Sequence, residues 1–575
     1  MRAQSARPLP QRVPPKRASQ IKSGFGVNVD LPRSPYLPWN RRWWTRIDDG
    51  GFKWVRLGQY EDSSDQTSWD WVERQRGVFG ISPRVDEYVN SLVDSSVHIE
   101  LQLLYGNPLY TSPAGLLPMT ILPTPGTFHN PDRSLNSIFW PPETPSQIAA
   151  FENYVRWMVR HFQGRIEYYE LWNEQDGGYW NPRPDPRQYG RLLKSFVRTV
   201  HETDPQAKVV YGGQASVSRD FARIALDTCQ CASGIDVFAY HTYPGGRSEN
   251  LNPEAMDSAG PGGDSAVALR EMVRAYPGIR PDISFWDNEF NAPPAWVQGM
   301  SASVQAQYVP RGMIYNWAAG VRTFIWELIN DTSDREGDER GLIHGMMHQP
   351  DDFQPLAVFD SVKNTNALFS DTRLDPTISI EAPGLSESSK ARPQPFLAYG
   401  FRRRDGKAIV AFWLAVISRP DRSVVSNTPL ILKNTGIRNP VMIDVDSGKI
   451  TPLEWEAGTT NTLKQVSVSD QVQAVVDKSY FDWPRLPATP SSLRVQVGRS
   501  GLKLAWHNHG NNYADVLVER RLGRTGHWQR IAKLPGSAHQ YADLQAPGGR
   551  QISYRVQAAG AEGGSGYSNV VDIVH

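Results

Sequence analysis

The sequence has little cysteine: Cys229 and Cys231 are the two cysteines among 575 residues. Because a single residue separates them, we expect that they could bond to each other only under strain, and we predict two inert thiols packed in the interior. A metal centre built on them would need further ligands at matching spacing. The sequence therefore predicts neither a disulfide framework nor a metal site.

The sequence also lacks an excess of charge of one sign and a long hydrophobic run. Its 61 Lys and Arg balance 60 Asp and Glu, which gives a formal net charge of +1. This balance argues against nucleic acid as a partner, since nucleic-acid binding favours a strongly basic surface. No apolar run reaches the length that spans a membrane, so we predict no membrane insertion.

Residues 1–20 contain no acidic residue and no apolar core of a secretory signal, but they hold five basic residues and four prolines. This composition predicts a disordered leader, which we interpret as the remainder of a trimmed export signal. We therefore expect a secreted or periplasmic protein. A basic arm that contacts nucleic acid is the alternative interpretation.

Short apolar runs alternate with longer amphipathic segments between residues 21 and 375, which is typical of βα units around a parallel sheet. One helix is expected over 145–162, with Ser146 as a candidate N-cap. Eight strands with eight crossovers predict a (β/α)8 TIM barrel with a long loop at 105–142. The expected strands are 24–29, 53–58, 97–104, 166–172, 208–213, 235–241, 282–288 and 322–328.

Two further units follow the barrel. Residues 376–484 contain hairpin signals at Asp405-Gly406 and Ser447-Gly448, which predict an all-β sandwich. Residues 487–575 resemble a fibronectin type III domain in "PATPSSLRVQV", in a core tryptophan at Trp506, and in "GYSNVV". This resemblance implies a second β-sandwich that acts as a spacer or docking surface.

The carboxyl ends of barrel strands face the active site, so polar residues there are the candidates for function. Two carboxylates stand out, Glu174 after the fourth strand and Glu289 after the seventh. Opposed carboxylates at a barrel mouth are typical of glycoside hydrolysis, and the 19 Trp and 22 Tyr suit stacking on sugar rings. The candidate substrate-binding residues are Arg56, Asn107, Trp172, Asn173, Trp180, Gln214, His241, Tyr243, Trp326 and Glu327.

These motifs resemble the retaining glycoside hydrolases of clan A, and most of all family 39. "ELWNE" (170–174) is similar to the acid/base motif of the clan, and "FWDNEF" (285–290) is similar to its nucleophile segment. "FAYHTYP" (238–244), "WVR" (54–56) and Trp326 match positions that line the sugar site. The chain departs from family 39 in Asp287-Asn288, where that family often has a small residue or Thr before the nucleophile.

The resemblance implies a retaining mechanism without a cofactor on an oligo- or polysaccharide substrate. Glu289 would be the nucleophile, with its pKa lowered by Arg56 and a hydrogen bond from Tyr243. Glu174 would hold a proton near neutral pH and act as general acid, then as base. Asn173 would contact the 2-hydroxyl of the sugar, and Trp326 would stack against the ring.

Other interpretations remain open from the sequence. Glu174 could be a capping or salt-bridged carboxylate, and Asp287 lies on the same predicted strand face as Glu289. We expect Glu170 and Glu100 to be structural, each paired inside the barrel with a basic or hydroxyl group. His241 could bind sugar or be a core histidine, and the acidic stretch 330–341 is expected to be solvated surface rather than a calcium loop.

The same residues would also fit a transglycosylase, or a silent carbohydrate-binding or adhesion protein. The sequence leaves open the sugar, the linkage, internal or terminal cleavage, and the oligomeric state.

Overall fold

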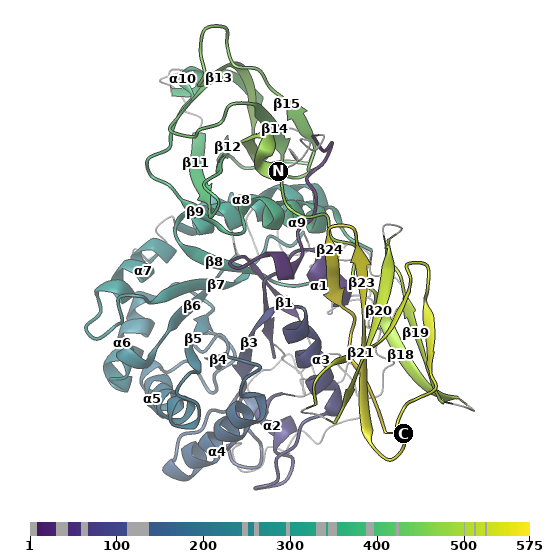
Figure 1. Cartoon of the computed structure of the whole chain (residues 1–575). Helices are drawn as coiled ribbons and strands as arrows, with labels where there is room; N and C mark the ends of the chain where they lie inside the picture. Colours follow the sequence, from purple (N-terminus) through teal and green to yellow (C-terminus); the bar gives the residue numbers. More distant parts are fainter. Residues whose placement is uncertain are drawn as a thin grey trace.

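The structure is a computed structural model in which the chain forms a barrel and two β-sandwiches (Figure 1). It describes residues 9–29, 44–58, 67–111, 137–243, 251–257, 264–294, 300–328, 341–342, 354–386, 396–420, 425–498, 501–510, 513–523 and 526–574. The predicted acidic stretch at 330–341 and most of the predicted long loop at 105–142 lie outside the described residues.

Eight parallel strands close into the barrel in sequence order, β1 to β8. This confirms the predicted fold and all eight predicted strand positions. The strands are β1 (Gly26–Val29), β2 (Trp54–Leu57), β3 (His98–Leu103), β4 (Tyr168–Leu171), β5 (Lys208–Gln214), β6 (Val237–Thr242), β7 (Ser284–Phe290) and β8 (Val321–Ile325). The last strand ends three residues earlier than expected.

Helices surround the barrel (Figure 1). The main ones are α1 (Trp44–Asp49), α3 (Pro83–Asp94), α4 (Pro145–Phe162), α5 (Pro186–Thr203), α6 (Arg219–Cys229), α7 (Ala266–Ala275), α8 (Ala302–Ala318) and α9 (Ala357–Phe369). Helix α4 has the predicted bounds, but its N-cap is Thr144 rather than Ser146. Thr144 forms a reciprocal capping box with Gln147, and Pro145 occupies the first turn, where its missing N–H is not needed.

The lower part of the barrel interior is packed with aromatic rings. Trp54 lies 5.0 Å from Tyr168 and 5.1 Å from Trp286, between ring centroids, and Trp286 lies 5.3 Å from Phe324. We call these four residues the barrel floor. Offset and edge-on contacts of this kind stabilise a core without hydrogen bonds, so the floor gives the strands a rigid base.

The second unit is the expected β-sandwich. A six-stranded sheet runs β15-β14-β17-β12-β11-β9, and a three-stranded sheet runs β10-β13-β16. The strands are β9 (Thr372–Leu374), β10 (Ser379–Glu381), β11 (Phe396–Arg403), β12 (Ala408–Leu414), β13 (Val425–Lys433), β14 (Pro440–Asp444), β15 (Ile450–Pro452), β16 (Thr462–Ser469) and β17 (Gln473–Asp477). Strand β9 begins before the predicted boundary.

The third unit is also a two-sheet sandwich, and Trp506 lies in its core. One sheet has the order β18-β19-β22 and the other β21-β20-β23-β24, with β25 paired to β23. The strands are β18 (Ser491–Gly498), β19 (Gly501–His507), β20 (Asp515–Leu522), β21 (Gln529–Pro535), β22 (Gln540–Asp543), β23 (Gln551–Gly560), β24 (Gly563–Tyr567) and β25 (Val571–Val574). Several families share this architecture, so the fibronectin identity stays a prediction.

The predicted disordered leader is wrong for residues 9–20. Ile450 donates its backbone N–H to Gln11, and Val13 donates to Gly448, so this segment extends the sheet of the second unit at β15. Arg17 is buried and forms ion pairs with Asp48 and Asp49 of α1. Arg17, one of the basic residues that suggested a free leader, therefore has partners within the fold.

The prediction of two free thiols is also wrong, because Cys229 and Cys231 form a disulfide. Gln230, between them, adopts the left-handed conformation (φ +50°) that ends helix α6. This turn brings the two Cα atoms to 5.1 Å, within the usual range for a disulfide.

Among the described residues, no helix is both long and apolar enough to cross a membrane.

Candidate active site

Glu174 lies in a tight turn directly after β4. Trp172 and Glu174 both have left-handed backbone conformations, with φ of +66° and +48°. The backbone N–H of Glu174 donates to the carbonyl of Gly213, at the end of β5. Such conformations are costly outside glycine and persist where the surroundings fix them. The turn therefore holds the Glu174 side chain at the barrel mouth, where it is 21% exposed.

Glu289 is placed by an irregularity in β7. The register between β7 and β8 shifts between Asp287 and Phe290, and the register between β6 and β7 shifts at Tyr240 and His241. A bulge breaks the two-residue alternation of a strand, so that Asn288 and Glu289 both point into the barrel.

The prediction that Asp287 shares a face with Glu289 is wrong for the same reason. The Asp287 carboxyl accepts hydrogen bonds from the backbone and hydroxyl of Thr242 and from Asn316 of helix α8. It therefore faces the helix layer and not the barrel interior. Burial raises the pKa of Asp287 to about 8, against the effect of these hydrogen bonds.

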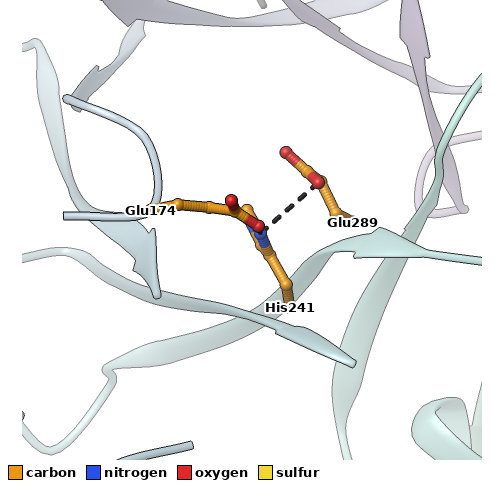
Figure 2. Close-up of side chains that lie close together, drawn as sticks. All are labelled: Glu174, His241 and Glu289. Atoms are coloured by element: carbon orange, nitrogen blue, oxygen red, sulfur yellow. Dashed lines mark hydrogen bonds and ion pairs between the residues drawn. The ribbon is translucent and has the colours of Figure 1, made fainter. Parts of the chain in front are cut away.

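The two glutamates meet beside His241 of β6 (Figure 2). The Nδ1 atom of His241 lies 3.1 Å from Oε1 of Glu174 and 3.4 Å from Oε2 of Glu289. These three atoms all lie within 4.8 Å of one another, which bounds the separation of the two carboxylate oxygens. Burial lowers the pKa of His241 to about 4, so near neutral pH its ring is uncharged.

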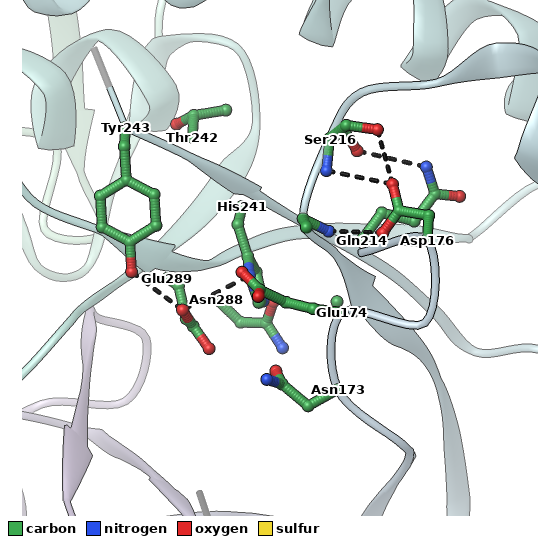
Figure 3. Close-up of polar contacts among 12 residues, drawn as sticks. Asn173, Glu174, Asp176, Gln214, Ser216, His241, Thr242, Tyr243, Asn288 and Glu289 are labelled. Atoms are coloured by element: carbon green, nitrogen blue, oxygen red, sulfur yellow. Dashed lines mark hydrogen bonds and ion pairs between the residues drawn. The ribbon is translucent and has the colours of Figure 1, made fainter. Parts of the chain in front are cut away.

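Glu289 has two further partners. Arg56 of β2 donates from Nη1 to Oε1 of Glu289 at 2.6 Å. The Tyr243 hydroxyl donates to Oε2 of Glu289 at 2.8 Å (Figure 3). Both predicted contacts are confirmed. Burial nevertheless raises the pKa of Glu289, and Glu174 raises it further, while His241 and Arg56 act in the opposite direction. Without Arg56, burial would therefore raise the pKa of Glu289 further.

A second polar layer lies directly beneath the two glutamates. Glu170 of β4 accepts two hydrogen bonds from Arg56, at 2.8 and 2.9 Å, as expected of a structural carboxylate with a basic partner. Asn288 donates to both Glu100 and Glu170. Burial and the neighbouring Glu170 raise the pKa of Glu100 well above its usual range. We call Arg56, Glu100, Glu170 and Asn288 the support layer.

Two more predicted residues lie at the mouth. The Asn173 side-chain oxygen accepts hydrogen bonds from Arg56 and Gln102, which turns its amide nitrogen toward the space beside the glutamates (Figure 3). Trp326 follows β8 and is partly exposed, with its ring 6.3 Å from the ring of Tyr243 in an edge-on contact. Contact of Asn173 and Trp326 with a sugar stays a prediction.

Five predicted residues lie behind this surface and are buried. Asn107 donates to the backbone of Trp69 and Glu73, and Gln214 donates to the backbone of Ser216 and Ser218. These bonds hold loops in place, so substrate contact by these residues stays a prediction. The other three are Trp172, bonded to the carbonyl of Tyr179; Trp180, bonded to Gln188; and Glu327.

Sequence reasoning missed two residues that hold the site in place. Asn28 of β1 accepts a hydrogen bond from Arg56, and its position as an amide inside the apolar run 24–29 could have revealed it. Asp176, two residues after Glu174, accepts hydrogen bonds from the backbone of Ala215 and from Ser216 (Figure 3). It thereby ties the turn that carries Glu174 to the end of β5.

Glu174, His241 and Glu289 also form the one group of possible metal ligands found among the described residues. Their spacing in the sequence gave no hint of this, because they come from three strands. The guanidinium of Arg56 already contacts Glu289 as a counter-cation, and a divalent ion would have to compete with that charge. We therefore assign no metal to this group.

The fold is a closed (β/α)8 barrel that brings two glutamates, Glu174 and Glu289, together at its mouth. No protein-family model matches the chain. A solved structure of a family 39 glycoside hydrolase from Bacteroides cellulosilyticus WH2 is similar at 18% identity, with a TM-score of 0.58 over 81% of this chain and 83% of that chain. This likeness confirms the fold that the resemblance to family 39 implied.

Two other solved structures are more distantly similar. One is a monomeric beta-xylosidase from Caulobacter crescentus CB15, with 14% identity and a TM-score of 0.49 over 81% of this chain and 97% of that chain. The other is a bacterial orthologue of human α-L-iduronidase, with 13% identity and a TM-score of 0.48 over 96% of this chain and 100% of that chain.

Proposed function

We propose that the protein is a retaining glycoside hydrolase, with Glu289 as nucleophile and Glu174 as general acid and base. One observation carries the proposal: oxygens of the two carboxylates lie within 4.8 Å of each other across the barrel mouth. Retaining enzymes need a separation of about 5–5.5 Å, whereas inverting enzymes need about 6.5–9.5 Å to admit a water molecule.

In the first step, a carboxylate oxygen of Glu289 attacks the anomeric carbon while the bond to the leaving oxygen breaks. Glu174 gives its proton to that oxygen, which leaves as an alcohol. In the second step, Glu174 removes a proton from water, whose oxygen attacks the same carbon and displaces Glu289. Each step inverts the carbon, so the product keeps the original configuration.

The neighbours of the two glutamates suit these roles. Arg56 and Tyr243 both contact Glu289, and they can stabilise the carboxylate that must be ionised to attack. Glu174 is more exposed than Glu289, as a group that must reach first the leaving oxygen and then water. The Asn173 amide is placed to donate to the 2-hydroxyl, and Trp326 offers a face for the sugar ring.

The proposed substrate is an oligo- or polysaccharide, and the proposed location is outside the cytoplasm. The disulfide between Cys229 and Cys231 supports an oxidising compartment. The names of the similar structures include a beta-xylosidase and an α-L-arabinofuranosidase. Aryl glycosides of pentoses are therefore the first substrates to assay, followed by polysaccharides with the lengths of the products recorded.

The decisive experiment compares E174A and E289A with a matched control, D287N, whose carboxyl lies on β7 but faces the helices. We expect both glutamate variants to lose turnover by orders of magnitude and the control to retain it. Azide should partly restore E174A on an activated aryl glycoside and give a product of retained configuration.

An inverted product from the wild-type protein would contradict the mechanism. Sugar binding in a thermal-shift screen without hydrolysis would favour a silent binding protein. Products longer than the substrate would instead identify a transglycosylase that uses the same two glutamates.

A further inference from the structure

The guanidinium of Arg56 is divided between two carboxylates. Its Nε and Nη2 atoms donate to Glu170, at 2.8 and 2.9 Å, in the side-by-side geometry that makes Arg–carboxylate pairs strong. Its Nη1 atom donates to Glu289 at 2.6 Å. Arg56, Glu170 and Glu289 are all buried, so water screens these interactions very little.

The charges in this region do not balance without a proton. Among the described residues, the titratable groups besides Arg56 that face Glu170 or Glu289 are Glu100, Glu174, His241, Tyr243 and Tyr189. Arg56 is the single cation among them, because burial keeps His241 neutral. Arg56 donates two hydrogen bonds to Glu170, whereas Glu100 accepts its hydrogen bond from Asn288, so Glu170 is the carboxylate of the support layer that competes with Glu289 for the positive charge.

Glu170 is also held more firmly than an ordinary counter-ion. The backbone N–H of Gly213 donates to Oε1 of Glu170 at 2.7 Å, and Asn288 donates to the same oxygen at 3.1 Å. Asn288 is the residue before Glu289 on the bulge, and its carbonyl accepts a hydrogen bond from Asn28. The same contacts therefore fix Glu170, Arg56 and the backbone that carries Glu289.

We propose that Glu170 is a positioning residue that draws part of the charge of Arg56 away from Glu289 and thereby keeps Glu289 a strong nucleophile. A carboxylate that had Arg56 to itself would be held more tightly as an anion, and it would attack carbon less readily. Glu170 thus sets the strength of the nucleophile from the layer beneath it, without touching the substrate. This inference rests on the proposed function, in which Glu289 attacks the sugar.

The test is the pH dependence of kcat/KM for wild type, E170Q and E100Q, with an aryl glycoside as substrate. Because E170Q removes a negative charge, we expect the acidic limb of the profile, which reports ionisation of Glu289, to move down by about one pH unit or more, and the maximal rate to fall. E100Q is the matched control: Glu100 accepts its hydrogen bond from Asn288 and not from Arg56, and its pKa is raised, so the limb should stay where it is.

A second measurement does not depend on activity. In a nuclear magnetic resonance titration with 13C-labelled glutamate, the pKa of Glu289 should fall in E170Q and stay unchanged in E100Q. The double variant E100Q/E170Q covers the case in which Glu100 ionises in place of Glu170, and it should show the full shift. Should E170Q not fold, E170D places its carboxylate one methylene farther from Arg56 and should give a smaller shift in the same direction.

An acidic limb and a Glu289 titration that stay unmoved in folded E170Q and in the double variant would overturn the inference and leave the proposed function standing. A wild-type protein without glycosidase activity would overturn the proposed function, and the titration alone would then decide whether Glu170 sets the charge on Glu289. A loss of activity in E170Q without any shift of the limb would mean that Glu170 has a merely structural role, and would also overturn the inference.

Discussion

The barrel floor and the support layer share three strands, on which their residues lie two positions apart on the same inward face. Trp54 precedes Arg56 on β2, Tyr168 precedes Glu170 on β4, and Trp286 precedes Asn288 on β7. The first residue of each pair is aromatic, and the second is charged or an amide. Within two residues along each of these strands, the barrel interior therefore changes from an aromatic, apolar layer to a polar, charged layer.

The floor is held by many weak van der Waals contacts, so the loss of one contact leaves the others in place. The support layer depends on a few directional bonds, and the removal of one partner leaves a buried charge without compensation. We therefore expect changes in the floor to reduce stability and leave the chemistry intact. Changes in the support layer should alter the chemistry and, where a charge is left unpaired, the stability as well.

The largest effect should follow removal of the cation, in R56M. Glu170 and Glu289 would both lose their counter-charge, at a cost of roughly 3–5 kcal/mol in the free energy of unfolding. Activity should fall by about 100-fold or more, as when an enzyme loses a key electrostatic donor. Urea unfolding would measure the change in stability, and kcat/KM would measure the change in activity. A fully active R56M would contradict the distinction between the support layer and the floor.

A smaller effect on activity is expected in the floor, in W286A. Loss of the ring contacts with Trp54, Tyr168 and Phe324 should cost roughly 3–5 kcal/mol of stability, the range for a buried aromatic residue. Activity per folded molecule should change little, because Asn288 and Glu289 keep their own hydrogen bonds. Active-site titration with a mechanism-based inhibitor would count the folded molecules. A kcat that fell as far as in R56M would show that a change in the floor also alters the chemistry.

The smallest effect on activity concerns Asp287, which lies between the two layers in sequence but faces the helices. Its pKa of about 8 exceeds the usual 3.8, so the folded protein retains a proton that the unfolded chain releases. Stability should therefore fall as the pH rises from about 4 to 8, by on the order of 1 kcal/mol per pH unit. D287N should flatten this slope in urea unfolding at several pH values. An unchanged slope would assign the pH dependence to other groups.

The regular parts of this molecule could be predicted from the sequence. Apolar runs between amphipathic helices predicted the eight strands, and their carboxyl ends predicted Glu174, Glu289, Arg56, His241 and Tyr243 as one group. These inferences succeed because the topology of a barrel fixes where strand ends meet, whatever the loops do.

The errors came from places where the backbone leaves its regular path. The bulge in β7 reversed the direction of Asp287, and the left-handed Gln230 brought two cysteines together that an extended chain would hold apart. The roles of Asn107 and Gln214 could not be predicted, because both residues bond to loop backbone that a strand pattern does not describe. In each case the local backbone path set the position of the side chain, and that path depends on tertiary contacts.

The segment 9–20 has a consequence for how such proteins can be recombined. It pairs with the second unit at Gly448 and Ile450, its Ala18 accepts a bond from Lys53 of the barrel, and its Gln20 donates to Pro484 at the end of the second unit. The third unit is in turn fixed to helix α3 by Arg555 and Val570. A graft that exchanges the barrel alone would cut the contacts of Lys53 and of helix α3, so the smallest interchangeable module runs from this segment to the last strand.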